Sequence, residues 1–164
     1  MDLTLEQSWD LLRGAERAVL CTTNARGAID AVPVCFAVVG TRVATPVERV
    51  KPKRTTALAR RRNLERAAAA TLLTDHWDAK DWARLWWVRA RLLWRAPSEV
   101  GAEFHESCQA ALRAKYSQYE GAQFVDVLVF DVTEIVGWSG SDAAPGSDAA
   151  PPGESQSGGS DPLM

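Results

Sequence analysis

The chain has 164 residues, 46% of them hydrophobic, and a formal net charge of −2. A chain of this length fits one domain with its own buried core. The nearly balanced charge favours neither nucleic acid nor a membrane surface as a partner, and the longest uncharged stretch of the folded part, residues 31–41, is too short to cross a bilayer. Because the N-terminus also lacks the pattern of a signal peptide, we expect a cytoplasmic protein.

The last 26 residues, from Ser139 onward, differ in composition from the rest of the chain. They contain five of the eleven glycines, four of the eight prolines and a tandem GSDAAP repeat. Such a segment buries too little apolar surface to offset the entropy of ordering it. The composition therefore predicts a folded domain over residues 1–138 and a disordered tail over residues 139–164. Without the four acidic side chains of the tail, the domain has 19 basic and 17 acidic residues.

The first elements along the chain are a helix and a set of strands. Thr4 and Gln7 have the spacing of a capping box, and apolar residues then recur with helical period until Gly14. The strands that follow are rich in β-branched and small apolar residues. Because Pro33 cannot donate to a strand ladder, it predicts a bulge or an exposed edge. The predicted elements are a helix over 4–13 and strands over 17–24, 28–39 and 41–45.

The second half of the chain alternates further helices and strands. The expected elements are a basic helix from Thr55 or Thr56 to about Asn63, strands over 67–77 and 84–96, a helix from Pro97 and a long strand over 123–138. In the helix from Pro97, one apolar face is formed by Val100, Phe104, Cys108 and Ala111 or Leu112. The fold class is therefore mainly β with flanking helices, and about six strands in hairpins favour a small barrel over an open sheet.

Residues that could carry catalysis on their own are scarce. Cys21, Cys35 and Cys108 form an odd set without metal-ligand spacing, so we expect reduced thiols packed in the core. His76 and His105 belong to no metal or nucleophile–base motif. We therefore expect no metal site and no catalytic side chain, and an organic cofactor as the source of any chemistry.

The strongest charge asymmetry is a basic segment. Eight of the nineteen basic residues lie between positions 49 and 66. Lys51, Lys53 and Arg54 come just before the expected helix start, where free backbone N–H groups and nearby cations favour phosphate or carboxylate. A solvated basic helix face remains an alternative. Nucleic-acid binding also remains open, although the cations form one cluster and do not follow a groove.

Three segments together resemble one known family. They are RAVLCTTNARGAIDAVPVCFAVVG (17–40), VATPVERVKPKRTTALARRRNL (43–64) and DHWDAKDWARLWWVRARL (75–92). They are similar to the opening hairpin and phosphate-binding region of the pyridoxamine 5′-phosphate oxidase-like (PPOX) split β-barrels. The last segment resembles the branch that depends on the deazaflavin coenzyme F420. The resemblance extends over about residues 3–138.

This resemblance implies a homodimer of six-stranded split barrels of the FMN-binding type, with a cofactor in each of two grooves at the subunit interface. It implies that Lys51, Lys53 and Arg54 hold the cofactor phosphate, with Thr55 as a further donor. It also implies that Thr45 and the backbone at Pro33 and Val34 lie beside the ring system.

The implied reaction is hydride transfer between reduced F420 and an unsaturated small-molecule acceptor. The FMN-using members have an RxVLLK-like segment that residues 34–45 do not reproduce, which favours the deazaflavin. An FMN-binding oxidase or reductase, or a flavin-binding protein, is the alternative, and a non-enzymatic binder of another anion is the third reading. Arg60, Arg61 and Arg62 either meet the polyglutamyl tail of F420 or are solvated.

Four of the seven tryptophans lie between residues 75 and 91. Side chains alternate across a strand, so Trp86 and Trp94 share an apolar stripe and are expected in the core. Trp87 shares the opposite face with arginines, which fits a subunit interface or a ligand groove. Trp77 and Trp82 flank a polar loop, where an indole either walls a planar ring or covers the end of the barrel.

Overall fold

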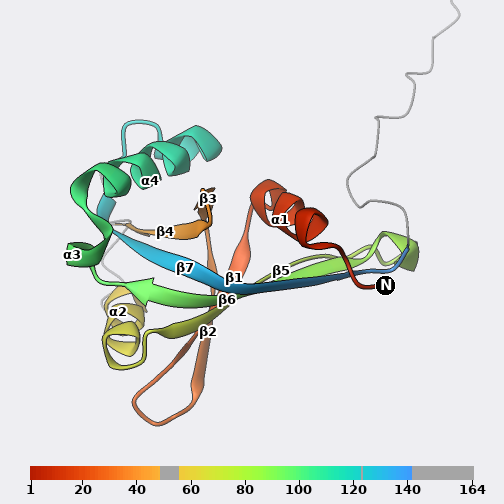
Figure 1. The fold of residues 1–164 in the computed structure, drawn as a ribbon, viewed down its shortest axis with the longest axis horizontal. Coiled ribbons are helices and arrows are strands. Elements are labelled where there is room, and N and C mark those ends of the chain that lie inside the picture. Colours follow the sequence, from red (N-terminus) through yellow and green to blue (C-terminus); the bar gives the residue numbers. More distant parts are fainter. Residues whose placement is uncertain (49–55, 123, 142–164) are drawn as a thin grey trace, which may run out of the picture.

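A computed structural model describes residues 1–48, 56–122 and 124–141 (Figure 1). Its elements are α1 (Leu5–Gly14), β1 (Ala18–Thr23), β2 (Ile29–Val34), β3 (Ala37–Val39), β4 (Arg42–Glu48), α2 (Thr56–Arg66), β5 (Ala69–His76), η1 (Trp82–Arg84), β6 (Trp86–Arg95), α3 (Pro97–Val100), α4 (Ala102–Lys115), η2 (Ser117–Tyr119) and β7 (Phe124–Ser139). The fold is mainly β with flanking helices, as the sequence predicts.

All the strands belong to one antiparallel sheet, in the order β2-β1-β5-β6-β7-β4-β3. The two edge strands, β2 and β3, are consecutive in the chain and are separated only by Cys35 and Phe36. Since an extended residue spans at most about 3.6 Å, the linked ends of β2 and β3 lie about 10 Å apart or less. The sheet must therefore curl, so that its two edges approach each other.

The expected count of six strands is wrong, because the predicted strand over 28–39 is divided into β2 and β3. At the break, the Phe36 amide donates to the Tyr116 hydroxyl at 3.0 Å, and that hydroxyl lies 2.9 Å from the Phe36 carbonyl oxygen. A side chain thus satisfies the backbone of Phe36, so the strand ladder can stop there. The edge predicted at Pro33 is confirmed, since β2 pairs only with β1 and Pro33 lies opposite Val19.

Two hydrophobic clusters stabilise the sheet. The larger one lies inside the curl and includes the fully buried Leu20, Leu72, Ala90 and Phe130. The smaller one lies between α4 and the other face of β3, β4 and β7, and includes Val129. The centre of β7 contributes to both clusters, which explains why its sequence is apolar on both faces. Each fully buried aliphatic or aromatic side chain contributes about 1.5–3 kcal/mol.

The predicted helices are present, although α2 extends to Arg66, beyond its expected end at about Asn63, and the helix expected from Pro97 is divided. At α1 the capping box is present, with Gln7 N donating to Thr4 Oγ1 and Thr4 N donating to Gln7 Oε1. The single helix expected from Pro97 is divided into α3 and α4, because Gly101 adopts a positive φ of 80° that ends the first turn. The predicted apolar face is nevertheless confirmed, with Val100, Cys108 and Leu112 buried.

The three cysteines are free thiols, but only one is part of the core. Cys108 is fully buried, and burial raises the pKa of its thiol to about 11. Cys21 and Cys35 are only partly buried, and Cys35, which lies between β2 and β3, packs against the smaller cluster. Full burial in the core therefore holds for Cys108 alone.

β7 ends at Ser139, one residue beyond the predicted domain boundary, and Ser139 is buried. Residues 142–164, which make up most of the predicted tail, lie outside the described residues. Within the described part of the chain, no helix is both long enough and apolar enough to span a membrane.

Candidate functional site

The outward face of β1, β5, β6 and β7 brings together side chains from distant parts of the sequence. Along one row of the sheet, Leu73 lies between Val19 and Arg89. In the next row, Trp87 lies opposite Trp138 on β7. The face is open to solvent, and Leu73 is 39% exposed. Apolar side chains thus form a partly exposed surface around a single guanidinium group.

These side chains and the end of β5 line an open pocket of about 700 Å³. Its walls are mainly aromatic and apolar. At one side, the rings of His76 and Trp86 are stacked with centroids 6.2 Å apart and an interplanar angle of 18°. The lining residues are Val19, Leu73, Asp75, His76, Trp77, Leu85, Trp86, Trp87, Arg89 and Trp138. Flat indole walls of this kind fit a planar ring better than an aliphatic chain.

The β5–β6 connection is held in place by short-range hydrogen bonds. Asp78 Oδ1 accepts from the amides of Lys80 and Asp81, and these bonds, that of Lys80 first, lower the pKa of Asp78. Gly140 N donates to Leu85 O at 2.8 Å, and a Cβ at Gly140 would lie 2.1 Å from the Trp82 carbonyl oxygen. The connection therefore presents its indoles from an ordered backbone. Figure 1 shows this hairpin projecting away from α2 and α4.

Among the described residues, Arg89 is the only arginine that lines this pocket. Its guanidinium carbon lies 5.9 Å from the centroid of the Trp87 ring, a cation–π contact. Its Nε is buried and has no hydrogen-bond partner among the described residues, and Arg89 makes no ion pair within that part of the chain. Within the part of the chain that the structure describes, the pocket therefore contains a half-buried positive charge without an ion-pair partner.

Helix α2, which carries the basic segment, is fixed to the sheet by polar contacts. Asn63 Nδ2 donates to Thr22 Oγ1 at 3.1 Å and to Asp30 Oδ2 at 2.9 Å, and Asn24 donates to the other oxygen of Asp30 at 2.8 Å. The hydrogen bonds from Asn63 and then Asn24 lower the pKa of Asp30. On its other side, α2 is joined to β7 by an ion pair between Arg61 and Asp126.

The residues expected to hold the phosphate lie outside the described part of the chain. These residues are Lys51, Lys53, Arg54 and Thr55. Of the residues expected beside the ring, Thr45 is fully buried, and its Oγ1 has no hydrogen-bond partner among the described residues. Val34 is also buried, and Pro33 is exposed on the edge strand β2. None of these three lines the tryptophan-walled pocket.

The structure separates the tryptophans into the groups that strand alternation predicts. Trp86 and Trp94 pack against the larger core cluster, as expected. Trp87 lies on the opposite face and lines the pocket together with Trp77, and Trp86 lines the pocket in addition to packing against the core. Trp82 is 69% exposed and lies outside the lining. The sequence analysis missed Trp86, Trp138 and Arg89 as site residues. Alternation along β6 places Arg89 beside Trp87, but only the register of β6 against β7 brings in Trp138.

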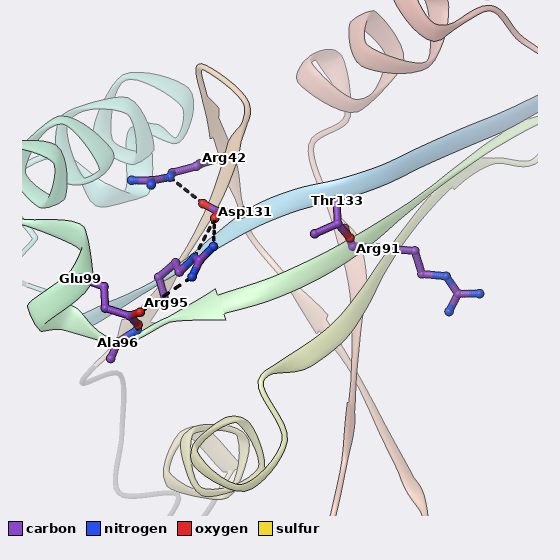
Figure 2. A network of polar contacts seen from close by, with 7 residues as sticks. All are labelled: Arg42, Arg91, Arg95, Ala96, Glu99, Asp131 and Thr133. Atoms are coloured by element: carbon purple, nitrogen blue, oxygen red, sulfur yellow. Dashed lines mark hydrogen bonds and ion pairs between the residues drawn. The ribbon is translucent and has the colours of Figure 1, made fainter.

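A second polar cluster, around Asp131, supports the fold rather than a ligand (Figure 2). Asp131 accepts hydrogen bonds from Arg42 Nε at 2.7 Å and from Arg95 Nε at 2.7 Å, and Arg95 Nη2 forms an ion pair with it at 2.6 Å. Partial burial raises the pKa of Asp131, but the bonds from Arg95 and Arg42 outweigh it and lower the pKa overall. Among the described residues, Arg42 and Arg95 are both paired with Asp131, so this cluster has no charge left for a ligand. Its ion pairs join β4, β6 and β7. Figure 2 shows the Arg91 side chain pointing away from it.

Among the residues that the structure describes, no group of three or more His, Cys, Asp or Glu side chains is placed to hold a metal ion. His105 lies 3.9 Å from Asp126, but that carboxylate is already paired with Arg61. The chemistry of the described site is therefore that of a binding pocket with aromatic walls and one cation.

No family model matches the chain, and no curated protein sequence matches it. Several solved structures do share its fold. An FAD-binding protein from Mesorhizobium loti superposes with a TM-score of 0.61 at 10% identity, over 84% of this chain and 95% of that one. An FAD binding protein from Mycobacterium smegmatis gives 0.52 at 17% identity, over 84% and 98%. A heme binding protein from the same organism gives 0.59 at 16% identity, over 82% and 57%.

The chain has the split-barrel fold. The similar structures are flavin- and heme-binding split barrels, and identities this low establish a common fold alone. In this split barrel the seven-stranded sheet provides the scaffold, and its outward face over β5 and β6 provides the pocket.

Proposed function

We propose that this split barrel binds a flavin, with the isoalloxazine ring against the tryptophans of the pocket, and acts as an oxidoreductase. The observation that carries the proposal is the pocket of about 700 Å³, which is lined by several indoles and by Arg89, whose Nε has no hydrogen-bond partner among the described residues. The shared fold with two FAD-binding proteins supports the same reading. A bound flavin supplies two-electron hydride chemistry, so no protein nucleophile is required.

The residues of the chain would bind and orient the ring. Trp87 and Trp138 lie opposite each other on neighbouring strands and offer an apolar surface on one side. Stacking of a planar heterocycle on an aromatic side chain contributes about 1–3 kcal/mol. The Arg89 guanidinium would donate to an electronegative edge of the ring, and the indoles would exclude water from it. This side-chain set therefore fits a planar, polar-edged cofactor.

The deazaflavin F420 is the second candidate. It is favoured by the basic composition of α2, in which Arg60, Arg61 and Arg62 are consecutive and Arg62 is exposed. An exposed cationic helix suits an anionic arm with several carboxylates. The transferred hydride would then reduce an unsaturated small molecule.

We also propose that the phosphate of either cofactor is bound by Lys51, Lys53 and Arg54, with Thr55 as a further donor, from their position before α2 in the sequence. Thr45, Pro33 and Val34 do not line the tryptophan-walled pocket, so we propose them as neighbours of an alternative position of the ring. For Thr45, the supporting observation is a buried hydroxyl oxygen without a partner among the described residues.

A homodimer is part of the proposal. The supporting feature is the outward face of β1, β5 and β6, where Leu73 is 39% exposed and Val19 and Trp87 are half-buried. A partly exposed apolar patch of this kind is typical of subunit interfaces. Light scattering of the full chain at micromolar concentration tests this part, and a monomer of 17.9 kDa would contradict it.

The cofactor is tested by titrating the purified full chain with FMN, FAD, oxidised F420 and hemin, following tryptophan fluorescence and cofactor absorbance. We expect saturable binding of FMN or FAD with a dissociation constant of about 10 μM or lower, close to −7 kcal/mol. Saturation by F420 alone selects the second candidate. Saturation by hemin alone, or by none of the four, overturns the proposal.

A further inference from the structure

We infer that the tryptophan-walled pocket selects planar aromatic ligands that carry a negative charge, and that Arg89 is the residue that determines this selectivity. The inference deepens the proposed function by stating that the edge of the bound ring carries a negative charge. It rests on the proposed function only for the identification of that ring as a flavin.

The first step is the state of the Arg89 guanidinium. An arginine is charged at every physiological pH, and burying part of it without a partner costs free energy. Arg89 Nε is buried and has no hydrogen-bond partner among the described residues, and the guanidinium carbon lies 5.9 Å from the centroid of the uncharged Trp87 ring. Arginines elsewhere in the described chain do have carboxylate partners, such as Arg95 with Asp131 at 2.6 Å. An anionic ligand would provide Arg89 with a negatively charged partner, as Asp131 does for Arg95.

The second step is the shape around that charge. Arg89 lies one row along the strand from the pair of Trp87 and Trp138, so the cation borders the indole surface. A ligand that stacks on the indoles would therefore have its edge near the guanidinium. Donation from a guanidinium to an ionised oxygen is about twice as strong as a neutral hydrogen bond. The pocket should thus prefer an anionic ring to a neutral ring of the same shape.

Asp75 also lines the pocket and opposes this preference. Its side chain is exposed, whereas part of the Arg89 guanidinium is shielded from water. Coulomb interactions in water are several times weaker than near a protein interior, so the charge of Arg89 dominates. Removing the charge of Asp75 should accordingly strengthen the preference for anions.

The neighbouring pocket provides the internal comparison. It has a volume of about 370 Å³ and is lined by Arg91, which is two residues from Arg89 on the same strand face. Arg91 is exposed, and its Nη1 donates to Thr71 Oγ1 at 3.5 Å. Because Arg91 is solvated and does not line the tryptophan-walled pocket, it serves as a matched control for charge.

The experiment measures the binding of 2-naphthoate and 2-naphthamide, a charged and a neutral probe of the same shape, to the full chain by titration calorimetry. We expect the wild type to bind the naphthoate about tenfold more tightly than the naphthamide, because one charge-assisted hydrogen bond contributes about that much affinity. R89Q should bind both probes equally, R89K should keep part of the preference, and D75N should increase it. R91Q should behave like the wild type.

Equal affinity of the two probes for the wild type, a preference that persists in R89Q, or no binding of either probe at millimolar concentration overturns the inference. Thermal melting of each variant checks that the fold is retained, and R89K reports on charge even if R89Q is less stable. Failure of the flavin titration together with a preference for naphthoate would reject the proposed function and leave this inference standing. Flavin binding that is equally tight in R89Q and in the wild type would reject this inference and leave the proposed function standing.

Discussion

Replacing Asp131 by asparagine tests the polar cluster that joins β4, β6 and β7. The carboxylate accepts two hydrogen bonds of 2.7 Å, one from Arg42 and one from Arg95, and Arg95 Nη2 forms an ion pair with it at 2.6 Å. Hydrogen bonds to charged groups are worth about 1.5–3 kcal/mol, and exposure of the side chains weakens them. Because Asp131 is 25% exposed and the two arginines 32% and 34%, we expect D131N to lower the free energy of unfolding at pH 7 by about 1.5 kcal/mol.

The assay is urea unfolding followed by circular dichroism, and the melting temperature should fall by about 3–6 °C. Since the pKa of Asp131 is lowered in the folded state, its stabilising contribution is present above about pH 4, the unfolded value, and is lost as the pH falls through the native pKa. The difference between wild type and D131N should therefore shrink from pH 4 downward. E134Q, an exposed acid-to-amide change on the same strand, is the control. A loss below about 0.5 kcal/mol at pH 7, or a difference that does not change with pH, would refute the reasoning.

Three further changes probe other parts of the molecule. G140A introduces a Cβ 2.1 Å from the Trp82 carbonyl oxygen, so it should displace the β5–β6 connection and change the near-ultraviolet tryptophan spectrum; an unaltered spectrum would contradict the close packing. Y116F removes the hydroxyl that satisfies Phe36, so the Phe36 amide should exchange with solvent faster and stability should fall by about 1–3 kcal/mol; unchanged protection would argue against that bond. Replacing Lys51 and Lys53 together by alanine should weaken cofactor binding about tenfold or more without unfolding the chain; equal affinity would remove the phosphate from these residues.

Much of the fold could be predicted from local patterns. Alternation along residues 84–96 correctly predicts that Trp86 and Trp94 pack against the core and that Trp87 faces the pocket, although Trp86 lines the pocket as well. The capping box at Thr4 and the edge position of Pro33 also depend on local chemistry and are confirmed. Local signals of this kind do not require knowledge of which segments meet.

The features that the sequence could not predict depend on contacts between distant residues. The break between β2 and β3 depends on the hydroxyl of Tyr116, which is 80 residues away from Phe36 in the chain. Trp138 faces Trp87 only because β7 pairs with β6 in a register that shifts at a bulge between Arg91 and Leu92. Register across a bulge is set by packing of the whole sheet, so no pattern within either strand specifies it.

The most direct test of the central claim is the dissociation constant of FMN for two alanine variants of the full chain. Trp87 lines the pocket, whereas Trp82 is exposed outside it, so W87A and W82A remove the same ring from different environments. The proposed stacking predicts that W87A weakens binding about tenfold or more, and that W82A leaves it within about twofold of the wild type. Equal affinity of the two variants would contradict a flavin ring in this pocket.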